Sequence, residues 1–262
     1  PAAEGQVRAP ALKQVAFVDA MVVADPRRGA QVNDIACAVV AVDPSDMSWL
    51  GLTASFGLRG RLGDAEAARF ERSMADVDLV VVHGARVLRH VLEVRFKLLA
   101  ALPWVCSKEA LRWSSTPNLE FQCMRLGYFF NAASTLQRAH ALSRLVCEAA
   151  VSGGGASSPM LQAVVEASSA VEMRVLYRLA DASASSADGI REQLHATGFQ
   201  WSDEDGAYVL SLQDGQQVQA CVRRLSSVPR IKGHVTVETI DARVRYSRRR
   251  GAIEKLALVG TA

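Results

Sequence analysis

The chain has 262 residues, of which 50% are hydrophobic and 22% are charged. This composition excludes a disordered chain and is typical of a soluble globular protein with one large domain, or one domain and a smaller companion. The formal net charge of +3 is too small to indicate nucleic-acid binding by itself.

The cysteines lie far apart and form no Cys-x-x-Cys pair, so we expect reduced, mostly buried thiols rather than a zinc site or a disulfide framework. No apolar run reaches the length that spans a membrane. The chain opens at Pro1 rather than at methionine, which a cleaved organelle-targeting segment explains and which a disordered start also explains.

The first periodic segment follows an arm without periodicity at residues 1–13. Val15–Val23 is apolar except for one acid, Asp19, and this pattern predicts a fully buried strand. A charged group in such a strand is costly unless a metal ion or hydrogen bonds hold it. Asp19 is therefore either a metal ligand or a side chain that is satisfied within the fold.

The following segments predict a meander of strands and then helices around one further strand. In chain order they are strands 34–43 and 48–56, a helix 64–75, a strand 78–83, a helix 85–102, a loop or short helix 104–113, and helices 118–129 and 133–150.

A Gly/Ser-rich segment at 152–158 has the composition of a flexible linker. It predicts a division into a domain at 14–151 and a small α+β domain at 159–250, followed by a C-terminal tail at 251–262. In the second domain we expect a helix from Pro159, a strand 173–179, a helix 187–196, strands 199–201 and 208–212, a helix 217–226 and a strand 235–241.

Three segments of the first domain resemble the proofreading 3'–5' exonuclease family, whose members are like the epsilon subunit and bind metal ions through four acids. They are Val15–Val23, Asp78–Glu93 (Asp-Leu-Val-Val-Val-His-Gly-Ala-Arg-Val-Leu-Arg-His-Val-Leu-Glu) and Leu126–Leu142. Ile190–Trp201 and Asp241–Arg249 resemble the companion domain of a bacterial subgroup of the family. The resemblance implies an α/β protein with an RNase H-like exonuclease fold, a mixed sheet flanked by helices, and a small C-terminal α+β domain.

The resemblance also implies which positions carried catalysis. The family places metal-binding acids at positions 19, 21, 88 and 138 of this chain, and a general-base histidine at 133. Only Asp19 remains, because the other positions hold Met21, Leu88, Ala133 and Arg138. We therefore expect no catalytic residue, no metal site and no cofactor.

Hydrolysis by two metal ions needs cations about 3.5–4 Å apart that several carboxylates clamp. A thioether is a poor ligand for Mg²⁺, and Arg138 would repel a cation, so we expect an Asp19–Arg138 salt bridge instead. The alternatives are substitute ligands such as Asp25 or Asp43, and a rescuing His140, which lies on another face of its helix than position 138. We interpret His83 as a scaffold residue, and Trp104, Trp113 and Trp201 as core residues.

The first hypothesis for function is a catalytically inactive exonuclease-fold protein that is a structural or accessory subunit of a larger assembly, such as a mitochondrial ribosome or a respiratory-chain complex. Its expected location is the mitochondrial matrix, or otherwise the cytoplasm. The alternative is a module that binds single-stranded nucleic acid without cutting it, and a third hypothesis is an active exonuclease with relocated ligands. The arginines expected to contact a protein partner or nucleic acid are Arg86, Arg89, Arg243, Arg245, Arg248 and Arg249.

Overall fold

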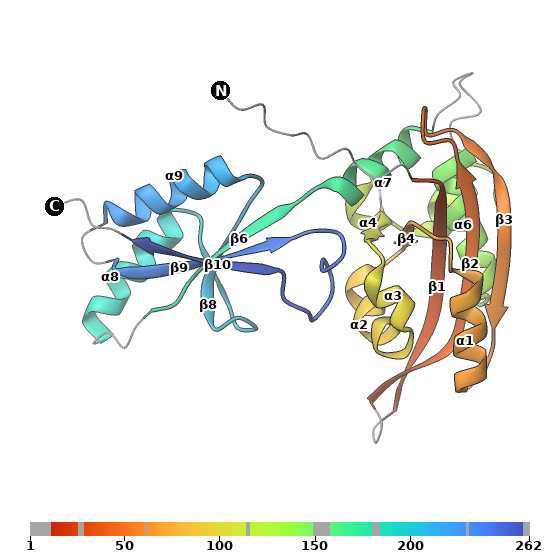
Figure 1. Ribbon diagram of the computed structural model, residues 1–262, viewed down its shortest axis with the longest axis horizontal. Helices are drawn as coiled ribbons and strands as arrows, with labels where there is room; N and C mark the ends of the chain where they lie inside the picture. The colour runs from red at the N-terminus through yellow and green to blue at the C-terminus, as the bar shows by residue number, and fades with distance from the viewer. Residues whose placement is uncertain are drawn as a thin grey trace. The chain divides into compact units, whose positions relative to one another are not determined.

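The protein is described here by a computed structural model, which covers residues 12–25, 29–60, 62–113, 116–148, 158–179, 184–228 and 231–258; the side chains of residues 25 and 184–187 are left aside. The chain forms two compact units. Figure 1 labels their helices and strands and colours the chain from red at the N-terminus to blue at the C-terminus. The first unit runs to Ser169 and also contains Arg245–Arg248, and the second unit comprises the rest of the chain from Ala170 onward.

The first unit is built on a five-stranded mixed sheet with the order β3-β2-β1-β4-β5. Strands β1 (Gln14–Asp25), β2 (Gly29–Val42) and β3 (Trp49–Leu58) form an antiparallel meander. Strands β4 (Leu79–Val82) and β5 (Trp104–Cys106) extend the sheet parallel to β1. Strand β4 is buried along its length, and β1 is buried from Val15 to Val18. Met21 and Val23 are 39% and 48% exposed, so the prediction of a fully buried strand over Val15–Val23 is wrong for the end of β1.

Helices cover both faces of this sheet, and the alternation of side chains along β1 decides what each face buries. Val15 and Phe17 pack in the cluster beneath helix α6 (Thr135–Glu148), whereas Ala16 and Val18 pack in the cluster beneath helix α2 (Ala85–Arg95). The α2 side holds α1 (Asp64–Ser73), α2 (Ala85–Arg95) and α3 (Lys97–Ala101), and the α6 side holds α4 (Ser107–Ala110), α5 (Leu119–Arg125), α6 (Thr135–Glu148) and α7 (Pro159–Ser169).

The helix predicted over 85–102 is two helices, because the backbone is extended at Phe96, which ends α2 and precedes α3. The Phe96 ring is fully buried and its centroid lies 5.0 Å from that of Phe70. Burial of this ring in the core outweighs the helical pattern on both sides of it. Trp104–Cys106, predicted as loop or short helix, is the edge strand β5.

The predicted arm and the predicted domain boundary both need correction. Leu12 is buried in the core of the first unit, and the Lys13 N–H donates to Asp78 Oδ2 at 2.8 Å, so these two residues belong to the domain. Residues 1–11 of the predicted arm lie outside the described part. Helix α7 also belongs to the first unit, since Leu161 and Val164 are fully buried in the same core. The second unit therefore begins at Ala170 rather than at 159, and residues 152–157 of the predicted linker lie outside the described part.

In its described residues, the second unit has an antiparallel sheet with the order β10-β9-β6-β8-β7 and two helices. Its elements are β6 (Glu172–Tyr177), α8 (Ala184–Ala196), β7 (Gln200–Ser202), β8 (Ala207–Leu212), α9 (Gly215–Ser226), β9 (Gly233–Ile240) and β10 (Ala252–Leu258). Leu194 of α8 and Leu225 of α9 pack with Val175 and Val235 of the sheet in one core.

The predicted C-terminal tail is wrong for residues 252–258, which form the edge strand β10 paired with β9. Gly251 allows this return of the chain, since a Cβ there would lie 1.9 Å from the Thr239 carbonyl oxygen. The Gly251 N–H also donates to Glu238 Oε1 at 2.9 Å. This close backbone approach is one that only glycine permits.

Two buried acids pair with two arginines in the second unit. Asp205 accepts from Arg174 at 2.5 Å and from Arg250 at 2.7 Å, and Arg250 also lies 3.2 Å from Glu238. Because the side chains of Asp205 and Glu238 are only 2% and 4% exposed, their charges require these partners.

The segment Arg245–Arg248 is anchored in the first unit by three side chains. Arg245 donates to the Ala167 carbonyl at 2.9 Å, Tyr246 to Glu109 at 3.0 Å, and Ser247 to Glu93 at 2.6 Å. Tyr246 has a φ of 66°, a left-handed conformation that non-glycine residues rarely adopt.

None of the helices in the described part of the chain has the length and the apolar character that a membrane span requires.

Candidate functional site

Asp19 and Arg138 form an ion pair on the α6 side of the first sheet, as the sequence predicts. Arg138 Nη2 lies 2.6 Å and Nε 2.7 Å from Asp19 Oδ2. Asp19 lies in β1. Arg138 lies in the first turn of α6, where its backbone N–H donates to the Ser134 carbonyl. The side chains are 16% and 27% exposed, so the pair is largely removed from water.

The guanidinium of Arg138 is also fixed by the loop before α6, since Nη1 donates to the Ala132 carbonyl at 2.5 Å. This loop is itself ordered by Asn131, whose Oδ1 accepts the Ala133 N–H at 3.0 Å. Arg138 is therefore positioned from two directions rather than merely drawn toward a carboxylate. The positive charge of the Arg138 guanidinium is thus fixed beside Asp19, where the resemblance to the exonuclease family implies a metal ion.

The pKa of the Asp19 carboxyl lies above its ordinary value, because burial raises it more than Arg138 lowers it. Hydrogen bonding and charge attraction from Arg138, together with the Ala20 N–H, act in the opposite direction. The carboxylate thus depends on Arg138 for its stability in the ionised form.

The remaining positions of the expected metal site do not supply ligands. Met21 is 39% exposed at the bulge where the β1–β2 register shifts. Leu88 is 8% exposed and packs with Val18 in the cluster beneath α2, away from the sheet face that carries Asp19. Ala133 is exposed in the loop before α6.

His83 follows β4 and has a hydrogen bond at each ring nitrogen. Nδ1 lies 2.8 Å from Ser107 Oγ, and Nε2 lies 2.7 Å from the Pro117 carbonyl oxygen. A carbonyl oxygen can only accept, so Nε2 carries the proton and neutral Nδ1 accepts from the Ser107 hydroxyl. Burial, and next the charge of Lys108, lower the His83 pKa to about 4. The ring is therefore neutral at pH 7 and has no free lone pair to act as a base.

The alternative ligands do not gather at Asp19 either. His140 Nε2 lies 2.7 Å from Ser55 Oγ of β3, and Asp43 Oδ1 accepts two hydrogen bonds from Ser45 in its own turn. The side chain of Asp25 lies outside the described part of the chain. Among the described residues, no group of three or more His, Cys, Asp or Glu side chains is placed to hold a metal ion.

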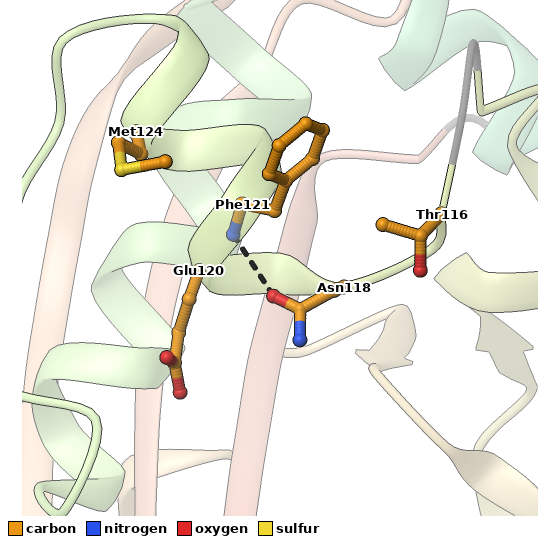
Figure 2. A pocket seen from close by; sticks show the side chains of 5 residues that line it. All are labelled: Thr116, Asn118, Glu120, Phe121 and Met124. Carbon is orange, nitrogen blue, oxygen red and sulfur yellow. Dashed lines mark hydrogen bonds between the residues drawn. The ribbon is translucent and has the colours of Figure 1, made fainter.

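A cleft of about 400 Å³ lies over the Asp19–Arg138 pair. A second hollow, of about 430 Å³, lies at α5 and shares three residues with the cleft. Figure 2 shows the second hollow, in which Asn118 Oδ1 accepts the Phe121 N–H at 2.9 Å. The cleft is lined by Asp19, His83, Lys108, Thr116, Pro117, Asn118, Leu119, Glu120, Phe130 and Arg138, and the hollow by Thr116, Asn118, Glu120, Phe121 and Met124.

The sequence prediction missed the hollow at α5. A signal was present, because the predicted helix over 118–129 places Phe121 and Met124 three residues apart, on one side. Without a structure, that pair fits a core-facing stripe equally well.

The arginines predicted to contact a partner have different environments. Arg89 is fully buried, where it donates to the carbonyls of Arg245 and Leu102, so it cannot be a surface contact. Arg86 is exposed and pairs with Glu109 at 2.8 Å. Arg243, Arg248 and Arg249 are exposed, and Arg245 is half-buried.

The predicted core tryptophans also differ from one another. Trp104 is fully buried, and its Nε1 donates to the Leu99 carbonyl at 2.8 Å. Trp113 is half-buried, with its ring centroid 5.9 Å from that of His83. Trp201 is 50% exposed, so the core interpretation is wrong for this residue. The cysteines of the described part are free, and Cys221 alone among them is not fully buried.

Comparison with known proteins gives little to add to this geometry. No family model matches the chain, and no curated protein matches it. One solved structure, described as "3'-end specific recognition of histone mRNA stem-loop by 3'-exonuclease", aligns with a TM-score of 0.39 and 10% sequence identity. The alignment covers 55% of this chain and 84% of the other.

Proposed function

We propose that the first unit is an RNase H-like exonuclease fold that has lost its catalytic metal site, and that the protein is a non-catalytic structural or accessory subunit of a larger assembly. The sheet order β3-β2-β1-β4-β5, with an antiparallel meander and two parallel strands, agrees with the mixed sheet that the resemblance implies. The second unit is then the counterpart of the small companion domain.

The Asp19–Arg138 ion pair is the observation that carries this proposal. A two-metal site needs several carboxylates to offset the charge of two divalent cations. Here the Asp19 carboxylate is the one acid that remains at the family positions. The Arg138 guanidinium, which cannot lose its proton, donates to Asp19 Oδ2. A metal ion would have to displace Arg138 and would gain a single ligand from the family positions.

Nuclease activity is the direct test of this proposal. The purified chain is incubated with 5'-labelled single-stranded DNA or RNA in Mg²⁺ and in Mn²⁺, beside the Asp19→Ala variant as control. We expect no shortening of the strand by either protein. Cleavage that Asp19→Ala abolishes would instead establish an active exonuclease with relocated ligands. The assembly role is tested separately, by whether the native protein sediments with other subunits in a large particle.

The alternative of a non-cleaving nucleic-acid-binding module has less support from the charges. Arg89 is buried, while Arg86 and Arg138 are each paired with an acid. We expect no salt-dependent binding of a single-stranded oligonucleotide at low ionic strength, where phosphate contacts are strongest.

A further inference from the structure

A cavity of the second unit lies where the edge strand β7 pairs with β8. Its volume is about 420 Å³, which is within the range of small-molecule sites. Trp201 of β7 and Tyr208 of β8 are direct cross-strand neighbours, and both line the cavity. The space beside Gly206 is open, since a Cβ built there would meet no atom within 4 Å. Among the described residues, the lining is Leu179, Arg191, Trp201, Gly206 and Tyr208.

Trp201 is 50% exposed, yet contacts on two sides hold its ring. Its Nε1 donates to Asp203 Oδ1 at 2.7 Å. Its ring centroid lies 5.3 Å from that of Tyr208, with an angle of 65° between the ring planes. The Tyr208 ring is in turn contacted by the ring of His195, at a centroid distance of 5.5 Å. A large aromatic surface that faces water in a fixed orientation is a preorganised platform on which another ring can pack.

The Tyr208 hydroxyl is a polar group that the described residues leave without a partner. Tyr208 is 4% exposed and packs in the core of the second unit, but no described residue forms a hydrogen bond with its hydroxyl. Tyr177, which is buried to the same extent, donates its hydroxyl to the Lys232 carbonyl at 3.3 Å.

The unpartnered hydroxyl of Tyr208 is accessible from the cavity. Within the described part of the chain, every fully buried side-chain oxygen or nitrogen has a hydrogen-bond partner, so an oxygen without one is not fully buried. The surface that Tyr208 lines is the cavity. Because a buried tyrosine hydroxyl usually has a hydrogen-bond partner, a ligand in the cavity can supply the missing one.

Arg191 is the charged side chain of the described lining. Its Nη1 donates to Asp188 Oδ1 at 3.2 Å, in a pair whose side chains are 53% and 72% exposed. An exposed pair contributes little to stability, so the guanidinium can bind a ligand at small cost. Asp188 and the Asp203 carboxylate that holds Trp201 are not among the lining residues. A guanidinium binds a carboxylate or a phosphate through two parallel hydrogen bonds, which predicts a ligand with such a group.

We infer that this cavity binds a small aromatic anion, which is a monocyclic or bicyclic ring that carries a carboxylate or a phosphate. The ring packs against Trp201, the anionic group accepts hydrogen bonds from Arg191, and the Tyr208 hydroxyl bonds to a polar atom of the ligand. The inference goes beyond the proposed function and does not depend on it, since all the lining residues belong to the second unit.

The test follows Trp201 in the full chain by NMR. The protein is labelled with ¹⁵N at tryptophan, and the indole N–H signal of Trp201 is the one that the variant Trp201→Phe lacks. The probes are indole-3-acetate and adenosine 5'-monophosphate, and indole-3-acetamide is the neutral match of the first. We expect at least one of the two anions to shift the Trp201 signal, which identifies the anionic group that the cavity takes. The amide should shift the signal far less.

Two variants separate the contributions of charge and hydroxyl. Arg191→Gln removes the charge, and Tyr208→Phe removes only the hydroxyl. Arg223→Gln is the matched control, because Arg223 is exposed on α9 of the same unit and does not line the cavity. We expect the affinity to fall at least about tenfold in Arg191→Gln and about threefold to tenfold in Tyr208→Phe, because charged hydrogen bonds are the stronger ones. It should be unchanged in Arg223→Gln. Circular dichroism confirms that the variants fold.

Several results would overturn the inference. Neither anion shifts the Trp201 signal at millimolar concentration, or the amide binds as tightly as the acid, or Arg191→Gln binds as tightly as the original chain. A shift caused by a single-stranded oligonucleotide but by neither small probe would also overturn it, since the surface would then be a nucleic-acid contact. The nuclease assay on the first unit decides the proposed function separately.

Discussion

The Asp19–Arg138 pair joins a residue of the first strand to one that lies 119 positions later in the chain. The sequence predicted this contact because two short motifs could be placed on one known arrangement of strands and helices. Composition alone would not have found it, since an acid in an apolar strand and an arginine on a distant helix are unremarkable when taken separately.

Removing one partner of this pair should cost more than removing both. We expect Arg138→Met to lower the free energy of unfolding by about 1–3 kcal/mol, below the 3–5 kcal/mol for a fully buried pair because both side chains are partly exposed. The double variant Asp19→Val/Arg138→Met should be close to the original protein, since its apolar residues leave no unpaired charge. Urea unfolding at pH 7 measures all the variants.

The pH dependence of Arg138→Met gives a second check on the same pair. The folded-state pKa of Asp19 is already raised by burial, and loss of Arg138 raises it further. An acid whose pKa is higher in the folded state than in the unfolded state contributes its full stability below the unfolded-state pKa. That contribution is lost as the pH rises through the folded-state pKa. The deficit of Arg138→Met relative to the original chain should therefore shrink as the pH falls from 7 toward 4. A deficit that is independent of pH would mean that the ion pair is not its source.

At the scale of elements, Arg89 is the main discrepancy between sequence and structure. Its charge predicted an exposed contact residue, yet its side chain is fully buried between α2, Trp104 and the segment Arg245–Arg248. The partners of its guanidinium include backbone carbonyls, such as that of Arg245, 156 positions away. Residue type cannot reveal partners of this kind, because every residue has a carbonyl.

Arg89→Met should destabilise the first unit strongly, by about 3–5 kcal/mol, because it removes a buried charge on which carbonyl and carboxylate groups depend. Arg89→Lys should not restore stability, since an ammonium cannot reproduce the planar fork of donors. Arg86→Met is the matched control on the same helix, and its exposed pair with Glu109 should contribute less than about 1 kcal/mol. Chemical denaturation followed by tryptophan fluorescence compares the three variants.

Strand β10 shows why the end of the second unit was missed. Ala-Ile-Glu-Lys-Leu-Ala-Leu contains mostly helix-forming residues and no β-branched residue except Ile253, so local propensity gives no strand signal. Pairing with β9 determines the structure instead, together with the glycine turn at Gly251.

Deleting residues 251–262 should therefore destabilise the second unit rather than leave it unchanged. The deletion exposes the edge of β9 and removes Leu258 from the core. We expect faster amide hydrogen exchange in β9 and β6, with exchange in β1 and β2 of the first unit unaffected. Unchanged exchange in β9 would support the original interpretation of a tail.

At the scale of the whole molecule, the two units carry different titrating groups and should respond differently to acid. In the first unit, His83 has a folded pKa of about 4, below its ordinary value of 6.5. The unfolded chain therefore binds more protons than the folded chain between these values, and stability falls as the pH falls through this window. Burial lowers the pKa of His140 as well, which adds to the effect. Burial raises the pKa of Asp19, and this shift acts in the opposite direction.

In the second unit, Asp205 is the acid whose pKa is shifted. Burial raises its pKa, but hydrogen bonds from Ser202 and Arg250 and the charge of Arg174 outweigh burial and lower it below 3.8. Its contribution to stability is therefore complete above that value and is lost only as the pH falls below it. Moderate acid should leave the Asp205 network intact.

We therefore expect a change from pH 7 to pH 5 to lower the melting temperature of the first unit and to leave that of the second unit nearly unchanged. Partial exposure of His83 reduces the expected loss to about 1 kcal/mol, or about 3 °C. Calorimetry measures the transitions, and hydrogen exchange of peptides from β1 and from β6 assigns each transition to its unit. His83→Gln should remove much of the shift, since a glutamine amide does not titrate. If the melting temperature of the second unit fell more than that of the first unit between pH 7 and pH 5, the assignment of these pH responses to His83 and Asp205 would be wrong.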